Sequence, residues 1–266
     1  MRTVVLSDHP DDMLSDEIGK RRQRASEQEA VLSTTVRDRE EARARGRWLR
    51  WLRLAFRAGR ERRELVRRRM FSQVPTHKED SIRAGRDAER RVAADLGCAL
   101  DDDWVLFRGY RNRRGEIDGI LLGPRGLLAY EVKYHNGTVY ISGDEWLSER
   151  FDKYGNLVRN RAPMQGSRSP SLQLSEPAAA LADWLGKRGQ QIAITPVVLL
   201  AHERSRIGAI RNPTVKVATS VEDLLRLAGR PAAKLGPGRR AAIEKIIRDD
   251  HRHHDHRARS RRMPAG

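Results

Sequence analysis

The sequence has few of the features that mark disulfide-bonded, zinc-binding or membrane-spanning proteins. Cys98 is its only cysteine, which excludes an internal disulfide and any Cys-rich zinc site. No apolar run approaches the roughly 18 to 20 residues that cross a bilayer. The N-terminus has only the apolar run 4–6 before acidic residues, so we expect no secretory signal. Phosphate-loop, GxSxG and HExxH patterns are also missing. We therefore expect a soluble protein of a reducing compartment, the cytoplasm.

Acidic residues are outnumbered, and the excess positive charge lies at the two ends of the chain. Lys and Arg number 53 against 36 Asp and Glu, giving a net charge of +17 over 266 residues. Residues 1–19 carry −4, residues 20–70 carry +11, residues 71–229 carry +3, and residues 230–266 carry +7. Two basic arms around a nearly neutral centre favour a polyanionic partner, either nucleic acid or an anionic lipid surface.

Composition and periodicity predict four segments. Residues 1–19 are expected to be acidic and disordered, and residues 20–77 to form a basic helical arm and a linker. Residues 78–229 are expected to form an α/β domain, followed in 230–266 by a basic helix and a disordered His/Arg-rich tail. The linker is expected to end at a helix cap at Asp80 or Ser81.

Within the central segment the pattern predicts a helix to about Leu96, an antiparallel meander, a second helix and a further strand. The expected strands are 104–110, 116–122, 127–133 and 138–142; the later elements are a helix at 174–187, strands at 195–201 and 213–220, and a short helix to Leu227. Residues 143–172 are polar and rich in Gly, Ser and Arg, so we expect a long loop there.

The basic arm contains an amphipathic helix with three alternative uses. In "RWLRWLRLAFR", arginines recur at spacings of three and four, and tryptophan and leucine lie between them. Such a helix at residues 47–57 could pack within the protein or in a homodimer, lie on an anionic membrane surface, or contact nucleic acid. The sequence leaves these three open.

Charged residues interrupt two otherwise apolar strands. If Pro124 and Arg125 form a two-residue turn, Asp118 lies opposite Glu131, where Cβ atoms are about 4.5 to 5.5 Å apart. Lys133 lies on the same face as Glu131, because side chains alternate along a strand. Two carboxylates at that distance repel each other, and a divalent cation such as Mg²⁺ would bridge them.

The preceding helix supplies a third carboxylate. Glu89 falls on an apolar stripe of that helix, so it needs a polar partner on the facing sheet. Two carboxylates, a lysine and a metal are the groups that phosphodiester hydrolysis uses, since the metal activates water and the cations stabilise the developing charge. The alternatives without a catalytic role are a buried salt-bridge network and an exposed sheet face with ordinary surface charges.

These residues carry a resemblance to a known family. Asp118, twelve further residues, and then "EVK" at 131–133 resemble the signature of the PD-(D/E)xK nucleases. The segments "AGRDAERRVAADL", "EIDGILLGPRGLLAYEVKYHNGTVY" and "SPSLQLSEPAAALADWL" resemble the nuclease-related domain family, NERD, over about residues 81–227. The position before Asp118 is Ile117, where the signature has proline.

The resemblance implies a restriction-endonuclease-like core of helix, antiparallel meander, helix and strand, with basic helical extensions. It implies that Asp118 and Glu131 bind Mg²⁺ or Mn²⁺ and that Lys133 assists the attacking water and the transition state. Glu89 matches the helical glutamate of the family. A glutamine at the start of the next helix matches Gln173, which we prefer to Gln165 because it follows Pro170 and opens a helical pattern.

We therefore expect a metal-dependent nuclease that hydrolyses DNA. Basic residues near the predicted meander are candidates for phosphate contacts, which position a duplex without reading its sequence; these are Arg111, Arg113 and Arg114. The alternative is a module on the same scaffold that binds nucleic acid or a membrane surface without cleaving anything.

Overall fold

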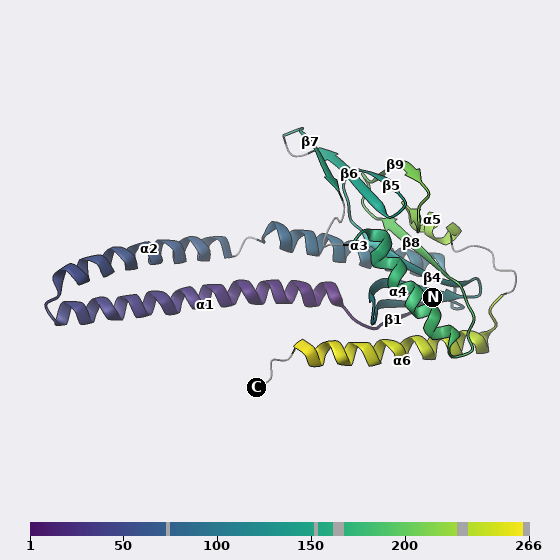
Figure 1. The fold of residues 1–266 in the computed structure, drawn as a ribbon, viewed down its shortest axis with the longest axis horizontal. Helices are drawn as coiled ribbons and strands as arrows, with labels where there is room; N and C mark the ends of the chain where they lie inside the picture. Colours follow the sequence, from purple (N-terminus) through teal and green to yellow (C-terminus); the bar gives the residue numbers. More distant parts are fainter. Residues whose placement is uncertain (73–74, 152–153, 162–167, 228–233, 263–266) are drawn as a thin grey trace. The chain divides into compact units, whose positions relative to one another are not determined.

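The computed structural model describes residues 1–72, 75–151, 154–161, 168–227 and 234–262. Within these ranges the chain has six helices and two mixed β-sheets, so the predicted α/β class is confirmed (Figure 1). The chain divides into two compact units. We call residues 10–84 the helical unit, and residues 1–9 with 85–266 the α/β unit.

The helices and strands have the following bounds. The helices are α1 (His9–Ala44), α2 (Trp48–Ser72), α3 (His77–Ala99), α4 (Pro170–Gly186), α5 (Val221–Leu227) and α6 (Pro237–Arg262). The strands are β1 (Arg2–Val5), β2 (Val105–Asn112), β3 (Gly115–Gly123), β4 (Gly126–Lys133), β5 (Thr138–Ser142), β6 (Glu145–Phe151), β7 (Leu157–Arg161), β8 (Ile194–Leu200), β9 (Arg206–Arg211) and β10 (Lys216–Ala218).

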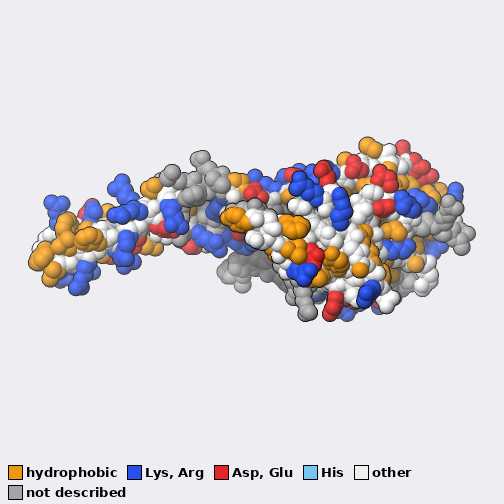
Figure 2. Space-filling view, turned by 90° about the horizontal axis from the view of Figure 1, so that it is seen from above, with side chains coloured by type: hydrophobic (Ala, Val, Ile, Leu, Met, Phe, Trp, Pro, Cys, Tyr) orange, Lys and Arg blue, Asp and Glu red, His pale blue; other side chains and the backbone are white. Residues whose placement is uncertain are grey.

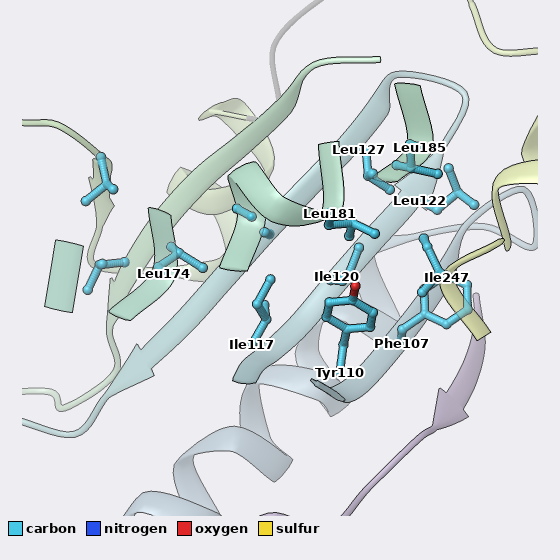
Figure 3. Packing of buried hydrophobic residues seen from close by; sticks show 14 of the residues in the cluster. Phe107, Tyr110, Ile117, Ile120, Leu122, Leu127, Leu174, Leu181, Leu185 and Ile247 are labelled. Atoms are coloured by element: carbon cyan, nitrogen blue, oxygen red, sulfur yellow. The ribbon is translucent and has the colours of Figure 1, made fainter. Parts of the chain in front are cut away.

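The larger sheet has the strand order β1-β2-β3-β4-β8-β10 and carries a helix on each face. Strands β2, β3 and β4 form the predicted antiparallel meander, and β8 then pairs parallel to β4. Helix α4 covers one face, where Leu181 lies over Ile120 in a buried cluster that also includes Leu174 (Figure 3). The buried face of α3 packs against the other side, which carries Leu128 and Tyr130 of β4.

The smaller sheet, with the order β7-β6-β5-β9, replaces most of the long loop expected at residues 143–172. Strands β6 and β7 form a hairpin on β5, and residues 162–167 lie outside the described part of the chain. Trp146 of β6 is buried, and its Nε1 donates a hydrogen bond to Ser171 Oγ at 2.7 Å. The loop prediction failed because short polar strands become stable only by pairing with a neighbour, which local composition does not encode.

Residues 1–19 were predicted to be disordered, and this is wrong. Strand β1 pairs in parallel with β2, and α1 begins at His9. Beyond the strand, the Leu6 N–H donates to the Arg108 carbonyl at 2.9 Å and Ser7 Oγ donates to the Gly109 carbonyl at 2.7 Å. The order of this segment comes from partners about a hundred residues away, so an acidic local composition could not reveal it.

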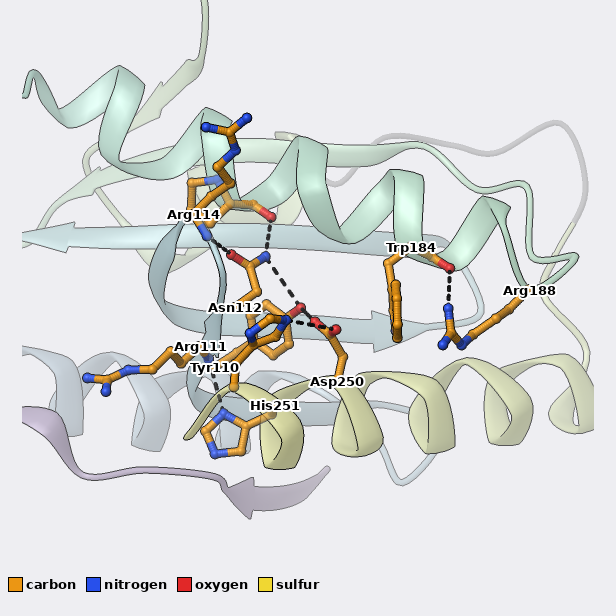
Figure 4. Close-up of polar contacts among 10 residues, drawn as sticks. Tyr110, Arg111, Asn112, Arg114, Trp184, Arg188, Asp250 and His251 are labelled. Atoms are coloured by element: carbon orange, nitrogen blue, oxygen red, sulfur yellow. Dashed lines mark hydrogen bonds and ion pairs between the residues drawn. The ribbon is translucent and has the colours of Figure 1, made fainter. Parts of the chain in front are cut away.

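The disorder expected for the C-terminal tail is also wrong, because α6 continues to Arg262. Ile243 and Ile247 are buried in the core, and the next turn carries a polar network (Figure 4). Tyr110 donates a hydrogen bond to Asp250, and His251 Nδ1 accepts one from the Arg111 N–H at 3.1 Å. The tail is helical because these side chains dock on β2.

Helix α3 begins before the predicted cap at Asp80 or Ser81. The Glu79 N–H donates to Thr76 Oγ1 at 3.2 Å, and the Thr76 N–H donates to Glu79 Oε2 at 3.3 Å. This reciprocal pair is a capping box, which "THKE" in the sequence already encoded. Within the described residues, we find no helix that combines the length and the apolar character needed to cross a bilayer.

Candidate active site

The β3–β4 hairpin has the register predicted from its turn. Gly123 pairs with Gly126 across Pro124 and Arg125, and the ladder continues without a slip to Gly119 and Tyr130. The ladder ends there, and at the next position the side chain of Asp118 contacts β4: its Oδ2 accepts a hydrogen bond from the Val132 N–H at 2.7 Å. The carboxylate of Asp118 therefore lies against β4 where the ladder ends, beside Glu131.

Lys133 joins the hairpin to α4. Its Nζ donates to Glu131 Oε1 at 2.8 Å and to Gln173 Oε1 at 2.7 Å. Gln173 Nε2 donates in turn to the Arg168 carbonyl at 2.8 Å, which fixes the orientation of the amide. The side chains of Lys133 and Glu131 are 19% and 13% exposed, so the pair is largely shielded from water.

Helix α4 places Gln173 by starting where the sequence allows it. Ser169 caps the helix, and its Oγ accepts a hydrogen bond from the Leu172 N–H at 3.3 Å. Pro170 follows in the first turn, where its missing N–H costs nothing. Gln173 lies in the first turn, as expected, whereas Gln165 lies outside the described residues.

The three carboxyl groups of the site are in electrostatic conflict. Burial and then the charge of Glu131 raise the pKa of Glu89 to about 7. Burial, followed by the charges of Glu131 and Glu89, raises the pKa of Asp118 well above its ordinary value. Burial alone would lower the pKa of Lys133, but the charges of Glu131 and Asp118 outweigh it and the pKa is raised. The site therefore contains a lysine cation and an excess of carboxylates.

Two further charged residues belong to this cluster, and neither was predicted from the sequence. The positive charge of Arg108 on β2 lowers the pKa of Glu89, and the negative charge of Asp8 raises it. Arg108 interrupts the apolar run of β2, which was a usable signal. Asp8 gave no signal, because it lies in the segment that was expected to be disordered.

The arginines proposed as phosphate contacts divide into two groups. The guanidinium of Arg111 forms an ion pair with Glu116 on the neighbouring strand. Arg113 and Arg114 are exposed in the turn that joins β2 to β3. Arg113 and Arg114 therefore remain accessible for a contact with phosphate, whereas Arg111 already neutralises a carboxylate.

The donor atoms of the site suit a hard divalent cation. Asp118 Oδ2 and Glu131 Oε1 each accept one hydrogen bond, and an ionised carboxylate has about four lone-pair sites, so both groups keep acceptor capacity for a metal. In the described part of the chain no three His, Cys, Asp or Glu residues are grouped so as to hold a metal by themselves. Mg²⁺ does not require such a cage, since it commonly uses one or two carboxylates, water and substrate phosphates.

Comparison with known proteins supports the predicted family. Residues 84–201 match the family model of the nuclease-related domain, NERD. Neither a curated protein nor a solved structure matches the chain. The matched segment contains Glu89, Asp118, Glu131, Lys133 and Gln173. Over residues 84–201 the chain is therefore similar to the nuclease-related domain family, as the motifs around Asp118 and Lys133 predict.

Proposed function

We propose that the protein is a metal-dependent nuclease that hydrolyses phosphodiester bonds in DNA. The observation that carries the proposal is the contact of Lys133 Nζ with Glu131 at 2.8 Å and Gln173 at 2.7 Å, beside the anchored carboxylate of Asp118. Carboxylates that repel one another where water is largely excluded destabilise a fold, even with a lysine beside them. A bound cation would reduce the repulsion between the carboxylates, and an anionic substrate would be attracted to that cation and to Lys133.

Asp118 and Glu131 would hold Mg²⁺ or Mn²⁺ through their carboxylate oxygens. Such a metal polarises a phosphoryl oxygen and lowers the pKa of a bound water. Lys133 would hold the attacking water and balance the charge that develops on the phosphorus oxygens. Gln173 would keep Lys133 in place. Glu89 has a pKa of about 7, so at neutral pH it would hydrogen-bond a water molecule in the site and exchange a proton with it.

The order of elements and the charge distribution agree with this proposal. Helix α3, the meander β2–β4, helix α4 and strand β8 follow one another in the order that the family resemblance implies, with the β5–β7 strands inserted before α4. The segment 20–70 carries +11 and the segment 230–266 carries +7, which favours binding to a polyanion. A cytoplasmic location and a homodimer stay predictions from the sequence.

The test compares cleavage by four single variants of the full chain. Supercoiled plasmid and single-stranded DNA are incubated with wild type in Mg²⁺ or in EDTA, and with Asp118→Asn and Lys133→Met. The control variants, Asp183→Asn and Lys187→Met, make the same changes at two exposed positions, one in the last turn of α4 and one directly after it. We expect wild type to cleave DNA only with Mg²⁺, and both control variants to keep full activity. The cleavage rate of both site variants should fall by about 100-fold or more, because each would lack a group that acts in the transition state.

Two outcomes would contradict the proposal. Equal cleavage by the site variants and the controls would assign the activity to a contaminant. DNA binding by wild type without cleavage under any metal would support the alternative, a non-catalytic module on the same scaffold.

A further inference from the structure

The helical unit carries an apolar surface that its own packing does not use. Trp48, Leu49 and Phe56 on α2 are 64%, 59% and 73% exposed, values that are high for large apolar side chains. Leu52 completes a stripe with them, because these four positions recur at spacings of three and four on one side of a helix. We call this set the apolar stripe of α2.

A different side of α2 makes the internal contacts. Ala58 and Leu65 are buried and Trp51 is half-buried, and these three residues recur every seven positions. Residues of α1, such as Ala42 and Thr35, are buried in the same unit. Of the two tryptophans in this helix, Trp51 therefore packs within the helical unit and Trp48 does not. Helices α1 and α2 form a helical hairpin, and its buried residues do not include the apolar stripe.

Arginines border the apolar stripe on its solvent side. They recur at spacings of three and four and are all exposed; they are Arg50, Arg53, Arg57 and Arg60. Between residues 42 and 60 the chain has seven arginines and no acidic residue. Among the described residues, no carboxylate lies within ion-pair distance of Arg50 or Arg53, whereas Arg57 pairs with Glu61 at 2.8 Å. Figure 2 shows orange and blue side chains together at the end of the hairpin.

We propose that α2 binds the surface of an anionic lipid bilayer through this apolar stripe and its arginine border. A helix of this kind lies in the plane of the interface, with its apolar face about 5 to 10 Å into the headgroup region. Arginine satisfies the negative headgroups, and the indole of Trp48 suits the boundary between water and hydrocarbon. This inference does not rest on the proposed nuclease activity.

Charge and surface chemistry favour a bilayer over the other occupants. A second copy of the chain would bring the same seven arginines against the first, without an acidic residue to neutralise them. Duplex nucleic acid would satisfy the arginines but would leave Trp48, Leu49 and Phe56 exposed to water, because its accessible surface is mostly phosphate and sugar. Of these three occupants, the anionic bilayer is the one that matches both the apolar stripe and its arginine border.

The experiment is co-sedimentation of the full chain with vesicles, without any nuclease assay. Vesicles of phosphatidylcholine alone are compared with vesicles containing phosphatidylglycerol, at 50 and 500 mM NaCl, and α-helix content is monitored by circular dichroism. We expect binding to the anionic vesicles that weakens in high salt, and much weaker binding to neutral vesicles, because the attraction of Arg to anionic lipid is screened by salt.

Two double variants separate the halves of the surface. Arg50→Gln with Arg53→Gln should lower binding to anionic vesicles by about 30-fold, since each basic residue near the surface contributes about 1 kcal/mol. Trp48→Ser with Phe56→Ser should lower it by about 100-fold, equivalent to about 3 kcal/mol at 1.4 kcal/mol per tenfold. Controls on α1, Arg22→Gln with Arg37→Gln and Val31→Ser, alter exposed residues of the same types and should bind as wild type.

Three results would overturn the inference. The first is an equal loss of vesicle binding in the α2 variants and in the α1 controls. A second is the absence of vesicle binding together with DNA binding that the α2 variants weaken, which would make nucleic acid the occupant. The third is the absence of vesicle binding together with self-association that Trp48→Ser with Phe56→Ser abolishes.

Discussion

Replacing Glu89 by glutamine should stabilise the protein at alkaline pH and in the absence of metal. Burial and the charge of Glu131 raise the pKa of Glu89 from an ordinary 4.5 to about 7. The folded state therefore disfavours the ionised carboxylate. The penalty is absent below the unfolded pKa, grows as pH rises from 4.5 to 7, and is complete above 7.

The size of this penalty follows from the pKa. The difference between about 7 and 4.5 corresponds to about 3 kcal/mol at 1.36 kcal/mol per pKa unit. Glutamine has nearly the same shape and no charge, so the Glu89→Gln variant escapes the penalty at every pH. Its gain over wild type in free energy of unfolding should therefore increase by about 2 to 3 kcal/mol between pH 5 and pH 8.

Urea denaturation of wild type and Glu89→Gln in EDTA, at pH 5 and pH 8, measures this change. Glu145→Gln, which alters an exposed glutamate on β6, is the matched control and should show no such pH dependence. A gain for Glu89→Gln that is equal at both pH values would refute the electrostatic account of the site. Adding Mg²⁺ at pH 8 should reduce the gain, because a cation held by Asp118 and Glu131 would offset the repulsion.

Three further substitutions test the packing and electrostatics of the α/β unit. His251 accepts a hydrogen bond from the Arg111 N–H, and burial lowers its pKa below the ordinary 6.5. The folded state therefore favours the neutral imidazole, and stability is lost as pH falls below 6.5. His251→Gln should reduce the loss of stability that urea titrations detect between about pH 7 and 5. Gly119→Ala would place a Cβ 2.1 Å from the Tyr130 ring and should destabilise the protein by about 3 kcal/mol or abolish folding. Gly85→Ala, where an added Cβ would meet nothing within 4 Å, should stabilise α3 by up to about 1 kcal/mol. Equal melting temperatures for these two glycine variants would contradict the close packing of Gly119 against Tyr130.

The part of the fold that could be predicted from the sequence is the part that short-range chemistry determines. The turn at Pro124 and Arg125 sets the register of the β3–β4 hairpin, and strand alternation then places Glu131 and Lys133 on one face. Ser169 and Pro170 mark the start of α4 in the same way and so locate Gln173. The candidate site could be predicted because it depends on these local signals.

The rest depends on contacts between distant segments. Strand β1 is ordered by pairing with β2, and the polar end of α6 is ordered by the contacts of Asp250 and His251 with β2. Neither segment has a local pattern that distinguishes it from a charged tail. The contribution of Asp8 to the electrostatics of Glu89 was hidden for the same reason, because it requires β1 to be in place first.

The strand order of the larger sheet has a consequence for work with fragments. The outermost strands, β1 and β10, both lie outside the family-matched segment 84–201, while the four strands between them lie inside it. A fragment cut at those borders would leave β2 and β8 with open backbone hydrogen-bonding groups, which invite aggregation with other chains. Insolubility of such a fragment would therefore reflect two missing edge strands, and biochemical tests of this domain require the whole chain.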